Sequence, residues 1–136
     1  MSPGEATDFI RSTMPLCATL GIRATDAGTG GVRLEIDWTE GLCTGGGVLH
    51  GGVIMALADS AGATCAYLNL PEGAAGTTTI ESKTNFLGAV RSGTARAEAT
   101  PLHVGGTTIV VETLVSDDGG RPVAKVTQTQ MVLRPR

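Results

Sequence analysis

The strongest constraint on the fold of this chain is one apolar stretch near its middle, which runs from Gly47 to Tyr67. The stretch reads GVLHGGVIMALADSAGATCAY, and it predicts a helix of about five turns near Gly51–Leu68. The segment NLPEGAAG follows, with the Pro and Gly that end helices. The predicted helix consists mostly of small apolar residues, apart from Asp59, and no Lys, Arg or Glu lies between Leu49 and Leu70. We therefore expect it to pack one face against a sheet.

Patterns typical of strands flank the predicted helix on both sides. Before it, the residues of VRLEIDW alternate between apolar and charged, which predicts a half-buried strand paired across a turn at Gly28–Gly31. After it, four strand-like runs occur at about residues 77–87, 93–103, 107–116 and 122–133, and SDDGG forms the hairpin turn between the last two. A short N-terminal helix at about residues 4–14 should end at Pro15. This order predicts an α+β fold, in which an antiparallel sheet wraps around one long central helix.

Length and composition exclude several classes of function. The chain has 136 residues, which predicts one domain over 1–136. A net charge of −3 without a Lys/Arg cluster argues against nucleic-acid binding. Three cysteines without a CxxC pair argue against a zinc site or a disulfide framework, and they favour a cytoplasmic protein. The N-terminus MSPGEATDFIRS is not apolar and polar residues interrupt the central stretch, so we expect no membrane association.

The start of the predicted helix carries His50, Gly51 and Gly52. The first turn of a helix has backbone N–H groups without carbonyl partners, and glycine lets a substrate carbonyl oxygen approach them. Taken alone, the three residues could simply cap the helix and form a tight turn. An acid nine residues after His50 on the same helix, Asp59, makes the pattern more specific for a catalytic site. Asp59 could instead be a surface residue if its face of the helix were exposed.

The spacing of these residues has a consequence for assembly. Asp59 lies nine residues after His50, about 13 Å along a helix axis. The first-turn amides and Asp59 of one chain are then too far apart to act on the same atom. We therefore expect a homodimer in which the helix start of one subunit and Asp59 of the other form two composite sites.

Three segments together resemble the hotdog-fold acyl-CoA thioesterases of the phenylacetic-acid-degradation and 4-hydroxybenzoyl-CoA thioesterase type. They are GGGVLHGGVIMALADSAGA, TTTIESKTNFLGAVRSGTARAEA and GRPVAKVTQTQMVL, and the resemblance spans roughly Leu20 to Leu133. It implies a hotdog fold, an acyl-CoA substrate and no metal. It also implies no cofactor, because coenzyme A is part of the substrate. It also implies that the homodimers pair into a dimer of dimers.

The resemblance also implies roles for individual residues. Gly51 would polarise the thioester carbonyl through its N–H, Asp59 would be the nucleophile or the general base, and His50 would orient the loop or contact the thioester. The family often has Asn six residues before this His, where this chain has Thr44. The Thr hydroxyl extends less far from the backbone than the side-chain amide of Asn. A Ser or Thr of the following strand often lies near the attacking water, and Thr79 is the favoured residue of TTT.

Candidate substrate-binding residues complete the predicted site. Phe86 would line the substrate channel, although it could equally be a core residue, and Gly52 lies in the first helical turn. Gly105, Gly106 and Thr107 resemble the place where the family's sheet edge meets the phosphates of coenzyme A, or they form a plain hairpin turn. Cys43 and Cys65 are not expected to act as nucleophiles, because neither has a His three or four positions away.

Hydrolysis of an acyl-CoA thioester is the leading prediction for function. A non-catalytic acyl-CoA binding or sensing protein is the main alternative, and Thr44 in place of Asn favours it. A hotdog-fold dehydratase is a weaker alternative, since the HGG helix start does not match the pattern around the His that this chemistry needs.

Overall fold

The computed structural model describes all 136 residues, Met1–Arg136. The elements follow one another as α1 (Pro3–Thr13), α2 (Pro15–Leu20), β1 (Arg23–Gly28), β2 (Gly31–Asp37), a short 3-10 helix (Glu40–Leu42), β3 (Cys43–Thr44), β4 (Val48–Leu49), α3 (Gly51–Leu68), β5 (Gly76–Phe86), β6 (Thr94–Val104), β7 (Thr108–Ser116) and β8 (Pro122–Leu133). The central helix has the bounds expected from the sequence, and each of the four later strands lies within one residue of its predicted position at both ends.

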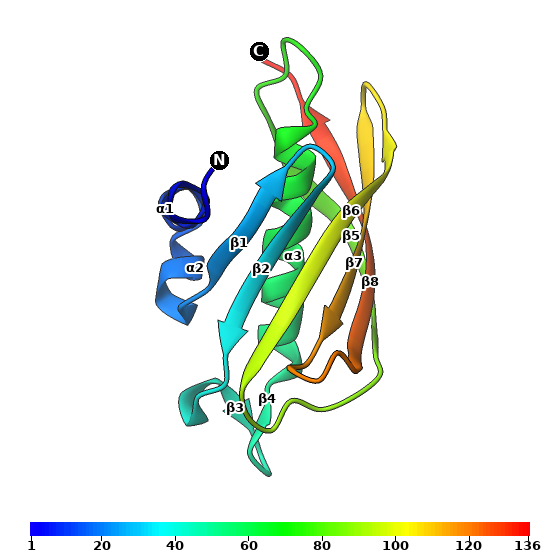
Figure 1. Cartoon of the computed structure of the whole chain (residues 1–136). Coiled ribbons are helices and arrows are strands. Elements are labelled where there is room, and N and C mark those ends of the chain that lie inside the picture. Colours follow the sequence, from blue (N-terminus) through cyan, green and yellow to red (C-terminus); the bar gives the residue numbers. More distant parts are fainter.

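Six strands form one antiparallel sheet in the order β1-β2-β6-β7-β8-β5. Figure 1 shows this sheet curving around α3, which runs along its concave side. The predicted α+β architecture, an antiparallel sheet wrapped around one long central helix, is confirmed. The strand that directly follows the helix, β5, lies at the edge of the sheet and pairs only with β8.

The N-terminal region differs from the prediction by a second short helix, α2. Ser2 and Glu5 form a capping box at the start of α1. The helix ends at Thr13, as the approach to Pro15 requires, but Pro15 also begins a second helix, because proline is well suited to the first helical position. Figure 1 shows α1 beside β1, at the edge of the sheet opposite β5.

The glycine-rich segment before α3 contains a small hairpin that the sequence pattern did not predict. Strands β3 and β4 pair through Thr44 and Val48, and Gly46 and Gly47 in the turn have φ angles of 83° and 73°. Only glycine adopts this backbone conformation readily, which accounts for the run of glycines. The backbone N–H of His50 donates to Leu42 O at 2.9 Å, so the end of the 3-10 helix holds the residue that precedes α3.

The central helix buries one side against the sheet and leaves the other side open. Buried apolar residues on the sheet side include Ile54, Leu57, Ala61 and Cys65. By length and composition α3 could span a membrane, but half of it is buried inside the fold, where it packs on β2, β5, β6 and β7. This is the pattern of a core helix.

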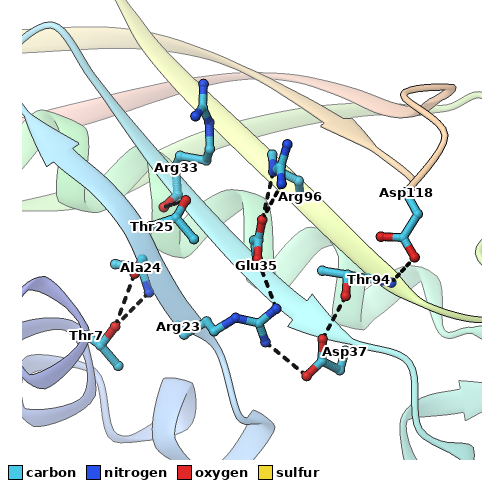
Figure 2. A network of polar contacts seen from close by, with 10 residues as sticks. All are labelled: Thr7, Arg23, Ala24, Thr25, Arg33, Glu35, Asp37, Thr94, Arg96 and Asp118. Carbon is cyan, nitrogen blue, oxygen red and sulfur yellow. Dashed lines mark hydrogen bonds and ion pairs between the residues drawn. The ribbon is translucent and has the colours of Figure 1, made fainter. Parts of the chain in front are cut away.

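A network of ion pairs stabilises the first strands of the sheet (Figure 2). Glu35 of β2 has only 9% of its side chain exposed, and it accepts hydrogen bonds from Arg23 (2.9 Å) and Arg96 (2.8 Å). Asp37 accepts from Arg23 at 2.9 Å and from Thr94 at 2.8 Å. The Arg23 guanidinium, followed by the Thr94 hydroxyl, lowers the pKa of the Asp37 carboxyl. These contacts connect β1, β2 and β6 across the sheet.

We predict that Glu35→Ala lowers the free energy of unfolding by about 1–2 kcal/mol, because two arginines lose the carboxylate that bridges them. The measurement is equilibrium urea unfolding. Glu98→Ala is the matched control: Glu98 pairs with Arg33 at 3.4 Å and both side chains are about half exposed, so we expect a change below about 0.5 kcal/mol. Equal effects of the two substitutions would show that the network is no more stabilising than a surface pair.

Candidate active site

Asp59 lies in the middle of α3 and is partly exposed, beside the face of the helix that packs on the sheet. Its Oδ1 accepts two hydrogen bonds, from the Thr79 hydroxyl at 2.7 Å and from the Gln128 side-chain amide at 3.0 Å. Thr79 belongs to β5 and Gln128 to β8, so the two strands at one end of the sheet hold the carboxylate. Both bonds go to the same oxygen, which leaves Oδ2 free to act on another group.

A second layer of hydrogen bonds orients Thr79. The Gln130 side-chain amide donates to Thr79 Oγ1, and Thr77 Oγ1 lies 3.1 Å from both Gln130 Oε1 and the Met131 carbonyl. Because Thr79 accepts from Gln130, its own hydrogen is directed to Asp59. The Gln130 amide and the Thr79 hydroxyl therefore donate in the same direction, toward the carboxylate.

The sequence reasoning missed Gln128 and Gln130. These side chains are only 1% and 0% exposed, and they alternate along β8 on the same side as the buried residues Val126 and Val132. Two glutamines at core positions of an otherwise apolar strand face indicate a buried polar group nearby, because a buried amide needs a hydrogen-bond partner. Here that partner is the group around Asp59.

Gly62 makes room for the Gln128 contact. It lies one turn beyond Asp59 on α3, and a Cβ at this position would overlap the Gln128 side chain. The small residue at position 62 thus lets an amide of β8 reach Asp59. Gly62 and Ala66 are both buried in the structure.

A β-bulge follows Thr79 directly. The pairing of β5 with β8 shifts register between Thr79 and Glu81, so that Ile80 is the extra residue. The bulge lets Thr77 and Thr79 face Asp59 and Gln130 while Ser82 and Thr84 also face inward farther along the strand. Of the three threonines in TTT, Thr79 is the one that contacts Asp59.

The start of α3 is capped by His50. Its Nδ1 accepts from the Gly52 N–H at 2.8 Å, and its carbonyl accepts from the N–H groups of Val53 and Ile54 at 2.9 and 3.2 Å. A Cβ at Gly52 would lie 2.9 Å from His50 Nδ1, so glycine is needed for this cap. The Gly52 N–H is therefore already used within the chain, and the Gly51 N–H is the first-turn donor left for a ligand.

Phe86 and Thr44 lie near this helix start. The Phe86 ring, at the end of β5, covers Gly51 closely enough that a Cβ there would lie 3.2 Å from Phe86 Cζ. The ring is half exposed, so it is a surface beside the Gly51 N–H rather than part of the core. Thr44 is exposed on β3 in the hairpin before the helix, and no hydrogen bond joins it to His50.

The loop with Gly105, Gly106 and Thr107 lies apart from these residues. Figure 1 shows the β6–β7 turn at the end of the molecule where α3 finishes, opposite the end where α3 begins. The Gly105 N–H donates to Thr108 O, Gly106 O accepts from Arg134, and Thr107 O accepts from the Val132 N–H. Within one chain, this loop and Gly51 therefore do not share a site, and its contact with a substrate stays a prediction.

The thiols show no sign of activation. Burial raises the pKa of Cys65 to about 11, and burial also raises the pKa of Cys17, whose Sγ donates to Ser60. Cys43 is partly exposed and directs its Sγ toward the Thr39 carbonyl.

No group of three or more His, Cys, Asp or Glu side chains is arranged to hold a metal ion. The carboxylate of Asp59 is thus the reactive group that the surrounding hydrogen bonds single out.

Comparison with known proteins shows the family of this chain. Residues 46–124 match the thioesterase superfamily, which covers the start of α3, Asp59 and Thr79. Rv1847 of Mycobacterium tuberculosis, which bears an esterase name, is 31% identical over 115 residues, or 83% of this chain and 82% of that protein. SSO2140 of Saccharolobus solfataricus, also named as an esterase, is 33% identical over 117 residues, or 86% of this chain and 82% of that protein.

Solved structures share the whole fold. Thioesterase HI1161 from Haemophilus influenzae has a TM-score of 0.89 at 25% identity, and the match covers 98% of this chain and 92% of that chain. A thioesterase family protein from Silicibacter pomeroyi has a TM-score of 0.86 at 28% identity, covering 98% and 100% of the two chains. The hotdog fold expected from the sequence resemblance is confirmed, and the chain belongs to the thioesterase superfamily.

Proposed function

We propose that this protein hydrolyses acyl-CoA thioesters to the free acid and coenzyme A, with Asp59 of one subunit and Gly51 of its partner acting on the same thioester. The observation that carries the proposal is the set of hydrogen bonds around Asp59, which fixes Oδ1 and leaves Oδ2 free. Membership of the thioesterase superfamily supports the reaction type. An acyl-CoA is the substrate class that we propose for this reaction.

The proposed chemistry needs one activated oxygen and one hydrogen-bond donor. The Gly51 N–H, at the positive end of the α3 dipole, stabilises the negative charge that develops on the thioester oxygen. Asp59 Oδ2 either attacks the thioester carbon itself or removes a proton from the attacking water. In the first case a mixed anhydride forms between Asp59 and the acyl group as the C–S bond breaks, and water then hydrolyses this anhydride. In the second case water adds directly to the carbonyl carbon before the C–S bond breaks. Both routes consume one water and release the free acid and the thiol of coenzyme A.

Two subunits are needed because Gly51 and Asp59 of one chain are separated along α3. They lie eight residues apart on the same helix, which is about 12 Å. Strand β5, which carries Thr79, is an edge of the sheet, and Ile80, Phe86 and Leu87 along it and at its end are 56%, 53% and 59% exposed. An unpaired edge with exposed apolar side chains favours pairing with a second copy. Association of such dimers into a dimer of dimers stays a prediction.

We predict that Asp59→Asn lowers kcat for acyl-CoA hydrolysis at least ~100-fold. Asn keeps an oxygen that can accept from Thr79 and Gln128, so the substitution removes the charge with little change in packing. The measurement is release of free thiol from short, medium, long and aryl acyl-CoAs. Asp26→Asn, an exposed carboxylate on β1, is the control and should retain wild-type rates. Full activity of Asp59→Asn would exclude both roles for Asp59, and binding of acyl-CoA without any turnover would favour a binding or sensing protein.

We predict that Gly51→Pro abolishes hydrolysis while Gly51→Ala retains part of it. Proline fits the first helical position but has no N–H, so it removes the proposed donor without breaking α3. Alanine adds the same Cβ beside Phe86 but keeps the N–H, so it reports the effect of crowding alone. The expected difference in kcat between the two variants is about 10²–10³-fold, the usual effect of losing one such donor. Equal activities would show that the Gly51 N–H does not contact the reacting carbonyl.

We predict that mixing the two inactive variants restores activity. In a composite site, a dimer of one Asp59→Asn chain and one Gly51→Pro chain has one site with both defects and one intact site. Random reassembly of equal amounts should therefore recover about a quarter of wild-type activity. Subunits are exchanged by brief partial denaturation, and thiol release is measured before and after. A site formed within one chain would show no recovery.

A further inference from the structure

Gln128 is a buried side chain with only one end of its amide hydrogen-bonded. Its Nε2 donates to Asp59 Oδ1 at 3.0 Å, but its Oε1 has no hydrogen-bond partner. Only 1% of the residue is exposed in the single chain, so a second subunit cannot reach this oxygen. A buried polar atom without a partner lowers stability, and such atoms are rare in folded proteins. The presence of glutamine at this position therefore needs a reason other than stability.

The charge of Asp59 determines which way the Gln128 amide points. An ionised carboxylate has only acceptor atoms, so the amide must present its NH2 group to Asp59. The Oε1 atom then lies on the side of Gly62, where a Cβ would overlap the amide group. The unpartnered oxygen is thus a direct consequence of the hydrogen bond to Asp59.

Gln130, also on β8, shows the contrast. Its Nε2 donates to the Thr79 hydroxyl, and its Oε1 lies 3.1 Å from the Thr77 hydroxyl. Both ends of the Gln130 amide have a polar neighbour, as is usual for a buried amide. Of the two buried glutamines beside the site, Gln128 alone has an oxygen without a partner.

The hydrogen bond from Gln128 restricts the orientation of the Asp59 carboxylate. The Thr79 hydroxyl from β5 and the Gln128 amide from β8 both donate to the same oxygen, Oδ1. A single donor would leave the carboxylate freer to turn about its Cβ–Cγ bond. With donors on two different strands, such a turn breaks at least one hydrogen bond. Oδ2 is thereby held in one direction, and catalysis is sensitive to the orientation of a reacting group.

We propose that Gln128 is a positioning residue for the hydrolysis, which orients Asp59 Oδ2 although an apolar side chain of similar size would make the fold more stable. This inference rests on the proposed thioester hydrolysis. It requires that loss of the Gln128 amide lowers kcat and raises stability at the same time. A purely structural role for Gln128 would instead lower stability when the amide is lost.

The first test replaces Gln128 with methionine, an apolar side chain of similar length. We expect Gln128→Met to lower kcat for acyl-CoA hydrolysis at least ~10-fold and to leave KM within about twofold, because Asp59 loses one of its two donors. The melting temperature should rise by about 2–5 °C, because no amide oxygen stays unpartnered and water can solvate the partly exposed Asp59. Either a wild-type kcat or a melting temperature that does not rise would overturn the proposal.

Thr113→Val is the matched control. Thr113 of β7 is fully buried and its Oγ1 also lacks a hydrogen-bond partner, but it forms no hydrogen bond with Asp59. Valine has nearly the same shape, so this substitution should also raise the melting temperature while kcat and KM stay at wild-type values. A loss of kcat as large as that of Gln128→Met would overturn the specific role of Gln128.

Gly62 offers a second test that keeps Gln128 in the chain. Gly62→Ala adds a Cβ that displaces the Gln128 amide, so kcat should fall at least ~10-fold. In a Gln128→Ala background the amide is absent, and the same alanine at position 62 should have no further effect on kcat. Equal losses in both backgrounds would show that position 62 acts without Gln128, which would overturn the proposal.

The same assays separate this inference from the proposed function. If the wild type releases no thiol from any acyl-CoA, the proposed function fails and the role of Gln128 in it fails as well. If the wild type is active and Asp59→Asn is inactive, while Gln128→Met and Gly62→Ala keep wild-type kcat, Gln128 has no positioning role and the proposed function stands.

Discussion

The site depends on hydrogen bonds that cross from the sheet to a carboxylate on an apolar helix. Asp59 lies among small apolar residues, where an unpartnered carboxylate would be strongly unfavourable. The Thr79 hydroxyl and the Gln128 amide stabilise the carboxylate by donating hydrogen bonds to it, and Gln130 orients Thr79. These contacts come from β5 and β8, which pair with each other, so the register between two strands decides where the donors lie.

The same contacts explain why particular small residues occur on α3. Glycine at position 62 admits Gln128, and glycine at position 52 admits the His50 cap. Ala63, one turn beyond Asp59, leaves space for a cavity instead of filling it. Small residues on this helix therefore have three separate roles. A helical wheel does not distinguish these roles, because it shows only where residues of similar size lie around the helix.

Much of the site was predictable from local patterns, and the rest was not. His50, Gly51 and Asp59 stood out because a glycine pair at a helix start and a single acid in an apolar helix are both unusual. Thr79, which the resemblance to the family favours among three neighbouring threonines, is the one that contacts Asp59. Gln128 and Gln130 lie about seventy positions from Asp59 in sequence, and nothing local connects them to it. The Gly105–Thr107 loop was grouped with the site, whereas the structure separates it from Gly51 of the same chain.

The sequence by itself determined the elements: the bounds of α3, the alternating strands and the α+β class all follow from periodicity over neighbouring residues. The edge position of β5 and the bulge at Ile80 were decided only in the tertiary structure. The physical reason is that periodicity reports which face of an element is buried, whereas strand order and register depend on contacts between distant segments. The hydrogen-bond network around Asp59 and the cavity beside it belong to this second class, because each is built from residues that meet only after the sheet has closed around the helix.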